Sequence, residues 1–151
     1  YILIQAGLGM VAGNFAGGRL ADKFSPSATV LALLLIMAAT LATVYYASSN
    51  HYISLLLVFL TGAVSFAMVA PIQMLMIQTA KDAEMIASAT IQASFNIGNA
   101  LGAFLGGLPL VAGYDYASPN LVGMTMSLLG ALAAFIFIRQ KKKQPLAAVC
   151  N

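Results

Sequence analysis

The sequence carries very little formal charge. Only 7% of its 151 residues are Asp, Glu, Lys or Arg, whereas 61% are hydrophobic. An average soluble domain is about 25% charged, so this chain has too few charges to cover a water-facing surface. A nucleic-acid-binding groove is excluded as well, because the net charge is only +3 and four of the seven basic residues sit together near the C-terminus. We therefore expect a lipid bilayer as the solvent of this chain and no nucleic acid as a partner.

Chemically reactive residues are equally scarce. The chain has one histidine, His51, and one cysteine, Cys150, whereas a metal site needs several clustered ligands. It contains none of the short motifs of zinc proteases, serine hydrolases or phosphate-binding loops. All four acidic residues fall outside the predicted membrane spans given below, so none of them is a candidate for a buried proton carrier. We expect no enzyme activity, no cofactor and no metal site.

Long charge-free stretches are what the sequence does contain. A membrane-spanning helix needs about 20 mostly apolar residues, and four stretches without a formal charge reach or approach that length. The longest has room for two helices and is divided near residues 48–52 by turn-tolerant residues and tyrosines. We predict an all-α polytopic membrane protein with five transmembrane helices, at about residues 1–17, 28–47, 53–79, 86–111 and 119–138.

The basic residues predict an orientation. With these five helices, all seven Lys and Arg residues fall on one side of the membrane, which should be the cytoplasmic side of a plasma membrane. Residues 139–151 then form a cytoplasmic basic tail. The chain begins at Tyr1, inside an apolar stretch, so we expect it to be the C-terminal part of a longer protein. The N-terminal half of that protein would be its partner.

Two of the predicted helices contain consecutive GxxxG steps. Residues four apart share one face of a helix, and a row of glycines lets another backbone approach closely. Such a groove provides packing, and because it lacks interlocking side chains it also permits sliding between helices. The predicted helix-packing glycines are Gly9, Gly13 and Gly17 in the first helix and Gly98, Gly102 and Gly106 in the fourth.

Polar side chains form a stripe on the fourth predicted helix. Ser88, Gln92, Asn96 and Asn99 lie on one face, roughly 75° around the helix from the glycines. Such a stripe either lines a water-filled path or joins helices by hydrogen bonds, and both interpretations stay open. In the third helix, Pro71 predicts a kink, and Gln73 beside it is the amide that we expect to face a cavity. The candidate substrate-cavity residues are Gln73, Gln92, Asn96 and Asn99.

The loop after the first predicted helix carries a recognisable pattern. Gly18, Asp22 and Lys23 resemble the signature loop of the major facilitator superfamily, although Ser25-Pro26 replaces the expected glycine and basic residues. Asp22 could accept hydrogen bonds from a helix N-terminus and pair with Arg19 or Lys23. The resemblance implies a conformational latch made of Gly18, Arg19, Asp22 and Lys23.

A wider resemblance covers nearly the whole chain. Pro71-Ile72-Gln73 and the segment 95–102 are similar to the drug/proton antiporter branch of that superfamily, and especially to bacterial sugar-efflux (arabinose-efflux-like) permeases. The resemblance implies that residues 1–138 are a partial C-terminal six-helix half, comprising helices eight to twelve of twelve.

The activity implied by this resemblance is proton-coupled efflux of a sugar or another small solute or drug, by alternating access in the bacterial inner membrane. Proton coupling rests on the resemblance alone. The alternative is a non-transporting membrane assembly subunit or scaffold, in which the polar stripe would only hold helices together.

Overall fold

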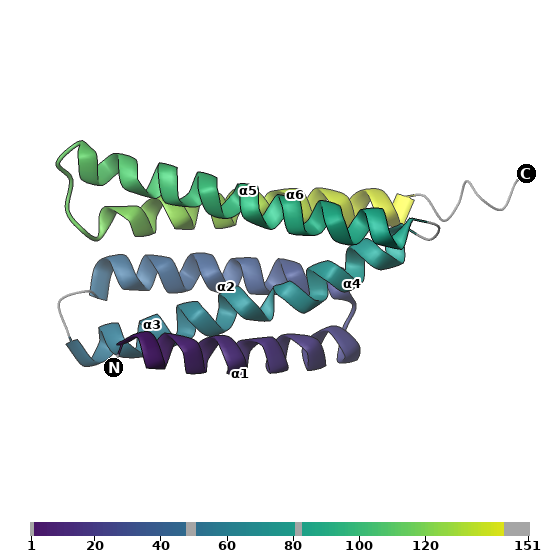
Figure 1. Cartoon of the computed structure of the whole chain (residues 1–151), viewed down its shortest axis with the longest axis horizontal. Coiled ribbons are helices and arrows are strands. Elements are labelled where there is room, and N and C mark those ends of the chain that lie inside the picture. The colour runs from purple at the N-terminus through teal and green to yellow at the C-terminus, as the bar shows by residue number, and fades with distance from the viewer. Residues whose placement is uncertain (1, 48–50, 81–82, 144–151) are drawn as a thin grey trace, which may run out of the picture.

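The computed structural model describes residues 2–47, 51–80 and 83–143, and these residues form only helices, turns and short connections. The helices lie lengthwise along a common direction (Figure 1). The predicted all-α class is thereby confirmed. The helices are α1 (Ile2–Lys23), α2 (Pro26–Ala47), α3 (His51–Ala67), α4 (Val69–Thr79), α5 (Glu84–Val111) and α6 (Ser118–Lys143).

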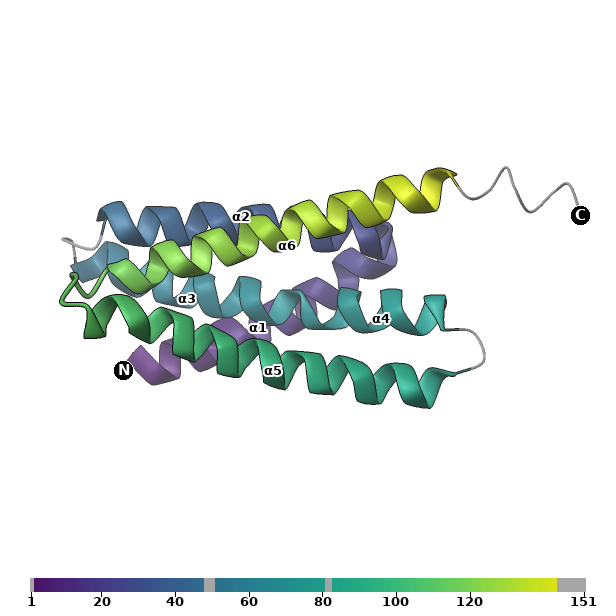
Figure 2. The same ribbon diagram turned by 90° about the horizontal axis from the view of Figure 1, so that it is seen from above.

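Four stretches of the described chain are long and apolar enough to cross a membrane: Pro26–Tyr46, Ile53–Thr79, Glu84–Val111 and Ser118–Lys141. They correspond to the second to fifth predicted spans. The first predicted span is also a helix, but α1 is less apolar because it combines glycines and Asn14 with charged residues at its C-terminal end. It nevertheless runs beside the other helices for its whole length (Figures 1 and 2).

Two helices extend beyond the ends expected from charge. α1 continues through the expected loop to Lys23, and the amide of Phe24 still donates to the carbonyl of Leu20 at 2.9 Å. α6 continues to Lys143, into the predicted tail, because Arg, Gln and Lys are good helix formers. A charge ends a membrane span without ending a helix, so the charges could not mark these boundaries.

The third predicted helix is interrupted at Met68, three residues before Pro71, where a kink was expected. α3 ends at Ala67 and α4 begins at Val69. Regular bonding resumes where the amide of Ile72 donates to the carbonyl of Met68 at 3.2 Å. The Pro71 side chain is fully buried, and its missing N–H accounts for the interruption.

The core lies between α2 and α3, where Leu33 and Met37 pack against Val64 and Ala67. α1 packs along α3, and α6 packs along α2. α5 has less support, because it contacts only α4 and α6 among the described helices. One long side of α5 is consequently left uncovered.

The basic residues gather at one end of the bundle. The C-terminal ends of α1, α4 and α6 point the same way (Figures 1 and 2), which puts Arg19, Lys23, Arg139 and Lys141 at that end. The segregation expected from the loops is therefore present among the described residues. Which compartment this end faces stays a prediction, and residues 144–151 of the predicted tail lie outside the described residues.

Candidate functional site

The polar stripe of α5 faces away from the bundle. The packed side of α5 is marked by the buried Ala87 and Ile91, whereas Gln92, Asn96 and Asn99 are all exposed. Because 87 and 91 lie on one face and the three amides are centred about 130° away from it by helical geometry, burial of the first pair turns the amides outward. The structure therefore brings these three candidates together on one surface.

The hydroxyls and the amides of α5 differ in their bonding. Thr90 and Ser94 each donate to a carbonyl of their own helix at 2.8 Å. Among the described residues, no hydrogen bond is made by the side chains of Gln92, Asn96 or Asn99. An amide needs partners for both its donors and its acceptor, and inside a bilayer lipid tails supply none. The amides are thus free to bind water, a solute or a further helix.

Gln73 lies on α4, the neighbour of α5. It is two residues beyond Pro71 and therefore about 200° around the helix from it, so burial of Pro71 directs Gln73 outward. No hydrogen bond joins Gln73 to the α5 amides within the described chain. The four candidates occupy adjacent helices without forming a closed polar cluster.

The glycines of α1 lie directly against α3. A Cβ added at Gly9, Gly13 or Gly17 would collide with the carbonyl of Phe59, Ala63 or Ala67, respectively. The approach is mutual, because a Cβ at Gly62 of α3 would lie 2.9 Å from the Ala6 oxygen. This seam has no space for any side chain larger than hydrogen.

The glycines of α5 have the same spacing but different surroundings. A Cβ at Gly98 or Gly102 would meet nothing within 4 Å, and one at Gly106 would only touch the Pro119 side chain at 3.9 Å. Among the described residues, no backbone occupies this groove. α5 therefore has two faces without a neighbour among the described residues: the glycine groove and the stripe of unbonded amides.

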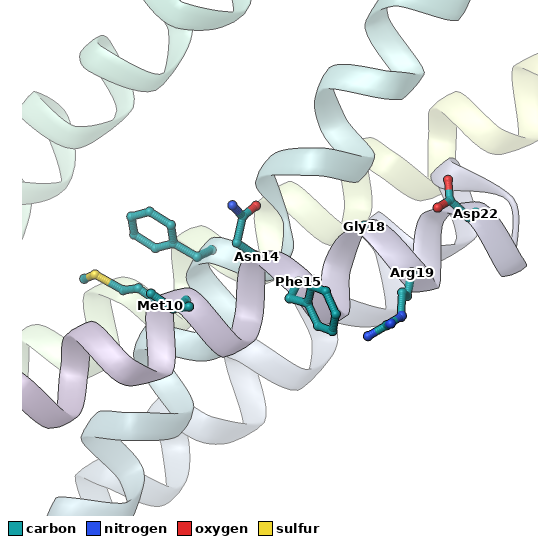
Figure 3. A pocket seen from close by; sticks show the side chains of 8 residues that line it. Met10, Asn14, Phe15, Gly18, Arg19 and Asp22 are labelled. Carbon is teal, nitrogen blue, oxygen red and sulfur yellow. The ribbon is translucent and has the colours of Figure 1, made fainter.

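A shallow groove of about 660 Å³ runs along the outward face of α1 (Figure 3). Asn14 and Asp22 extend from one side of the helix in this view, and Phe15 and Arg19 from the other. The sequence reasoning missed Asn14, although its four-residue spacing to Gly18 and Asp22 was the available signal. The groove is lined by Met10, Val11, Asn14, Phe15, Gly18, Arg19 and Asp22 of α1 and by Phe66 of α3.

The predicted latch residues do not form the expected ion pairs. The guanidinium of Arg19 lies 3.8 Å from the centre of the Phe15 ring, and Lys23 lies 5.8 Å from that of Phe24. In the described parts of the chain neither cation pairs with Asp22. For Arg19, stacking on a ring one turn back requires no desolvation of a carboxylate, which makes it the easier contact at the helix end.

The α1–α2 connection is held by two hydroxyl residues that the sequence reasoning passed over. The Ser25 hydroxyl accepts the Ala28 amide at 3.4 Å. The buried Thr29 hydroxyl lies 3.2 Å from the Ser25 carbonyl and 3.4 Å from the Leu20 carbonyl. The signal was Ser25-Pro26 itself, since Ser at the N-cap followed by Pro is a common helix start.

The described residues contain no group of three or more His, Cys, Asp or Glu that could hold a metal ion. Cys150 lies outside the described residues. The candidate site offers neutral amides, bare glycine backbone and a cationic helix end.

Residues 2–149 match the family model described as Major Facilitator Superfamily. The chain is 32% identical to the putative transporter AraJ of Escherichia coli K12 over 95% of its own length and 36% of the relative's. It is 31% identical to the inner membrane transport protein YdhP of the same strain, again over 95% and 36%. A probable sugar efflux transporter of Helicobacter pylori P12 is 31% identical over 89% and 33%.

The chain thus spans about a third of the length of these curated relatives. No solved structure matches it. The family match covers nearly the whole chain, and the helices have the lengths and composition of a multi-pass membrane protein. The chain belongs to the major facilitator superfamily.

Proposed function

We propose that this major facilitator superfamily chain supplies helices eight to twelve of a twelve-helix secondary transporter, which exports a sugar or another small solute or drug. The names of the relatives, among them a probable sugar efflux transporter, support export of a small molecule. In this proposal residues 1–138 are most of the C-terminal half, and the other helices come from residues outside this chain.

The observation that carries the proposal is the bare amide stripe of α5. Gln92, Asn96 and Asn99 are exposed and unbonded within the described chain, in a helix apolar enough to cross the membrane. Polar groups at membrane depth face a protein interior or a water-filled cavity. Amides offer donors and acceptors together, as do sugar hydroxyls, so the stripe is suited to hold a neutral polar solute.

The bare glycines support movement at the same helix. Alternating access needs two halves that rock around a central site. Gly98 and Gly102 leave a smooth groove on α5, and this groove can take the backbone of a helix from the other half without interlocking side chains. We propose that the N-terminal half is the partner that covers it.

Proton coupling belongs to this proposal by family resemblance. No acidic residue lies between residues 85 and 114 or in the apolar stretch 24–80, so the proton-carrying group would lie outside this chain. We also propose that the protein resides in the bacterial inner membrane with its basic end in the cytoplasm. The gathering of basic residues at one end of the bundle (Figure 1) supports that orientation, and the similarity to the inner membrane transport protein YdhP supports that location.

The test is transport by the full-length protein in proteoliposomes, with labelled sugars and cationic drugs and an imposed proton gradient. The Asn96→Leu/Asn99→Leu double variant should keep the thermal stability of the wild type and lose most uptake. The matched control is Ser94→Ala, whose hydroxyl is bonded within its own helix, and it should transport normally.

The scaffold alternative predicts the opposite pattern. If the amides only join helices, the double variant should lose stability or assembly, and the wild type should move no solute. Absence of uptake for every solute tested, in a sample shown to be folded, would overturn the transport proposal.

A further inference from the structure

α1 and α3 run side by side, in the same direction and in constant register. The three glycines of α1 each face one residue of α3, and the sequence separation within each pair is the same. The pairs are Gly9 with Phe59, Gly13 with Ala63 and Gly17 with Ala67. The contacts advance by four residues at a time on both helices, so the two helices run in the same direction. The seam therefore ends where α3 ends, at the pair formed by Gly17 and Ala67.

The last contact of this seam differs chemically from the other two. The carbonyls of Phe59 and Ala63 lie inside α3, where residues four further on provide helical N–H donors. The carbonyl of Ala67 would need the N–H of residue 71, which is proline and has none. Ala67 is also buried, so water cannot easily replace the missing donor.

Gly17 lies against this carbonyl. A Cβ on Gly17 would collide with the Ala67 oxygen and would come within 2.7 Å of the Ala67 Cα and carbonyl carbon. Only a glycine presents two Cα hydrogens at this position, and Cα–H groups donate weak hydrogen bonds to carbonyls at close helix contacts. The residue that α1 presents to the proline-freed oxygen is thus the one residue type that fits and can donate to it.

We infer that Gly17 is a positioning residue, which holds the bend between α3 and α4 and thereby sets the place of Gln73. This inference rests on the proposed function, in which Gln73 lines the solute cavity. Gln73 lies only two residues beyond Pro71, so a displacement of the Ala67 backbone is carried directly into α4. Gly17 itself need not touch the solute.

The first measurement is geometric and needs no solute. Spin labels on cysteines at the exposed positions Leu56 in α3 and Ile77 in α4 report the bend in the full-length protein, with Cys150 replaced by Ser. Gly17→Ala should shift this distance. Gly7→Ala is the matched control, since a Cβ there meets nothing within 4 Å, and should leave the distance unchanged.

Gly13→Ala tests whether the effect is specific to the bend or follows from any disturbance of the α1–α3 contact. Its Cβ would also strike α3, but one turn before the break. It should weaken the α1–α3 contact and shift the distance less than Gly17→Ala. Should Gly17→Ala fail to fold, Pro71→Ala supplies the missing N–H without adding bulk to the seam, and it should shift the same distance toward a straighter helix.

Transport kinetics provide the second measurement. Gly17→Ala should raise KM about tenfold or more at a smaller change in kcat, because a displacement of about 1 Å in a positioned group can cost up to a hundredfold. An unchanged spin-label distance in both Gly17→Ala and Pro71→Ala, or equal shifts in Gly17→Ala and Gly13→Ala, would overturn the inference. If Gly17→Ala shifts the spin-label distance but the wild-type protein moves no solute, the proposed function is refuted. The role of Gly17 in holding the bend between α3 and α4 would still stand.

Discussion

The guanidinium of Arg19 stacks on the ring of Phe15 at 3.8 Å and forms no ion pair with Asp22. The two stacked residues are one helical turn apart, so α1 itself supplies the surface that holds the cation. Asp22 is left exposed at the edge of the α1 groove. The cation and the carboxylate of the proposed latch are therefore separately available to a partner.

Replacing Phe15 with Leu should free Arg19. We expect a loss of about 0.5–1 kcal/mol in unfolding free energy, the usual size of an exposed cation–π contact, measured by unfolding the purified full-length protein in detergent. Phe24→Leu is the control and should cost less, since Lys23 lies 5.8 Å from that ring. Equal losses in the two variants would show that ring burial, and not stacking, is being measured.

The two glycine series should respond differently to alanine. Gly13→Ala should destabilise the protein by about 1–3 kcal/mol or more, the cost of overpacking a tight contact, because its Cβ would strike the α3 backbone. Gly102→Ala should not destabilise the helices in this chain, since nothing lies within 4 Å of its Cβ and Ala is the better helix former. Thermal unfolding measures both, and a large loss for Gly102→Ala in the isolated chain would contradict the open groove.

Thr29 should be important for the α1–α2 connection. Thr29→Val keeps the shape of a buried side chain and removes the hydroxyl that reaches the Leu20 and Ser25 carbonyls. We expect a loss of about 1 kcal/mol. Thr43→Val removes an exposed hydroxyl bonded to the Ala39 carbonyl at 2.8 Å and should be nearly neutral, because that carbonyl keeps its helical N–H donor.

Asn14 should matter for activity more than for stability. Its amide is exposed in the α1 groove and makes no hydrogen bond within the described chain. Asn14→Leu should therefore keep the melting temperature and reduce uptake in proteoliposomes. Ala12→Leu, another exposed position on α1 that does not line the groove, controls for added bulk. A fall in stability with Asn14→Leu would instead indicate a packing role.

The two ends of the bundle should be accessible from opposite sides of the membrane. Cysteines at Tyr116, in the α5–α6 connection, and at Gln140, near the end of α6, lie at opposite ends of that helix. An impermeant thiol reagent applied outside intact cells should label position 116 and spare position 140. Labelling of both from one side would contradict the orientation proposed from the basic residues.

The sequence was sufficient for the helices and their order, because long apolar stretches have one favourable solution in a bilayer. It was also sufficient for the break at Pro71, whose missing N–H acts locally. It could not indicate that α1 would extend to Lys23. A charged residue marks the end of a membrane span, but it does not end the helix. Nor could it distinguish stacking of Arg19 from pairing, which depends on the direction of a flexible side chain.

For the glycines, the sequence could not predict which of them are packed against another helix. Gly13 and Gly102 have the same sequence signature, yet one is closed by α3 and the other is open. The difference lies in the neighbour, which spacing within a single helix cannot reveal. The same reasoning applies to the amides of α5, whose direction follows from the burial of Ala87 and Ile91 and whose binding partners are not set by this helix alone.

The register between α1 and α3 has a practical consequence. α1 is held along its length by backbone-to-backbone contact with a helix that is not its neighbour in the chain. Severing the connection at residues 24–25 would therefore leave α1 attached through the seam. Two co-expressed pieces divided at this point should reassemble spontaneously, which makes this junction a natural place to split the protein for complementation or to insert a reporter.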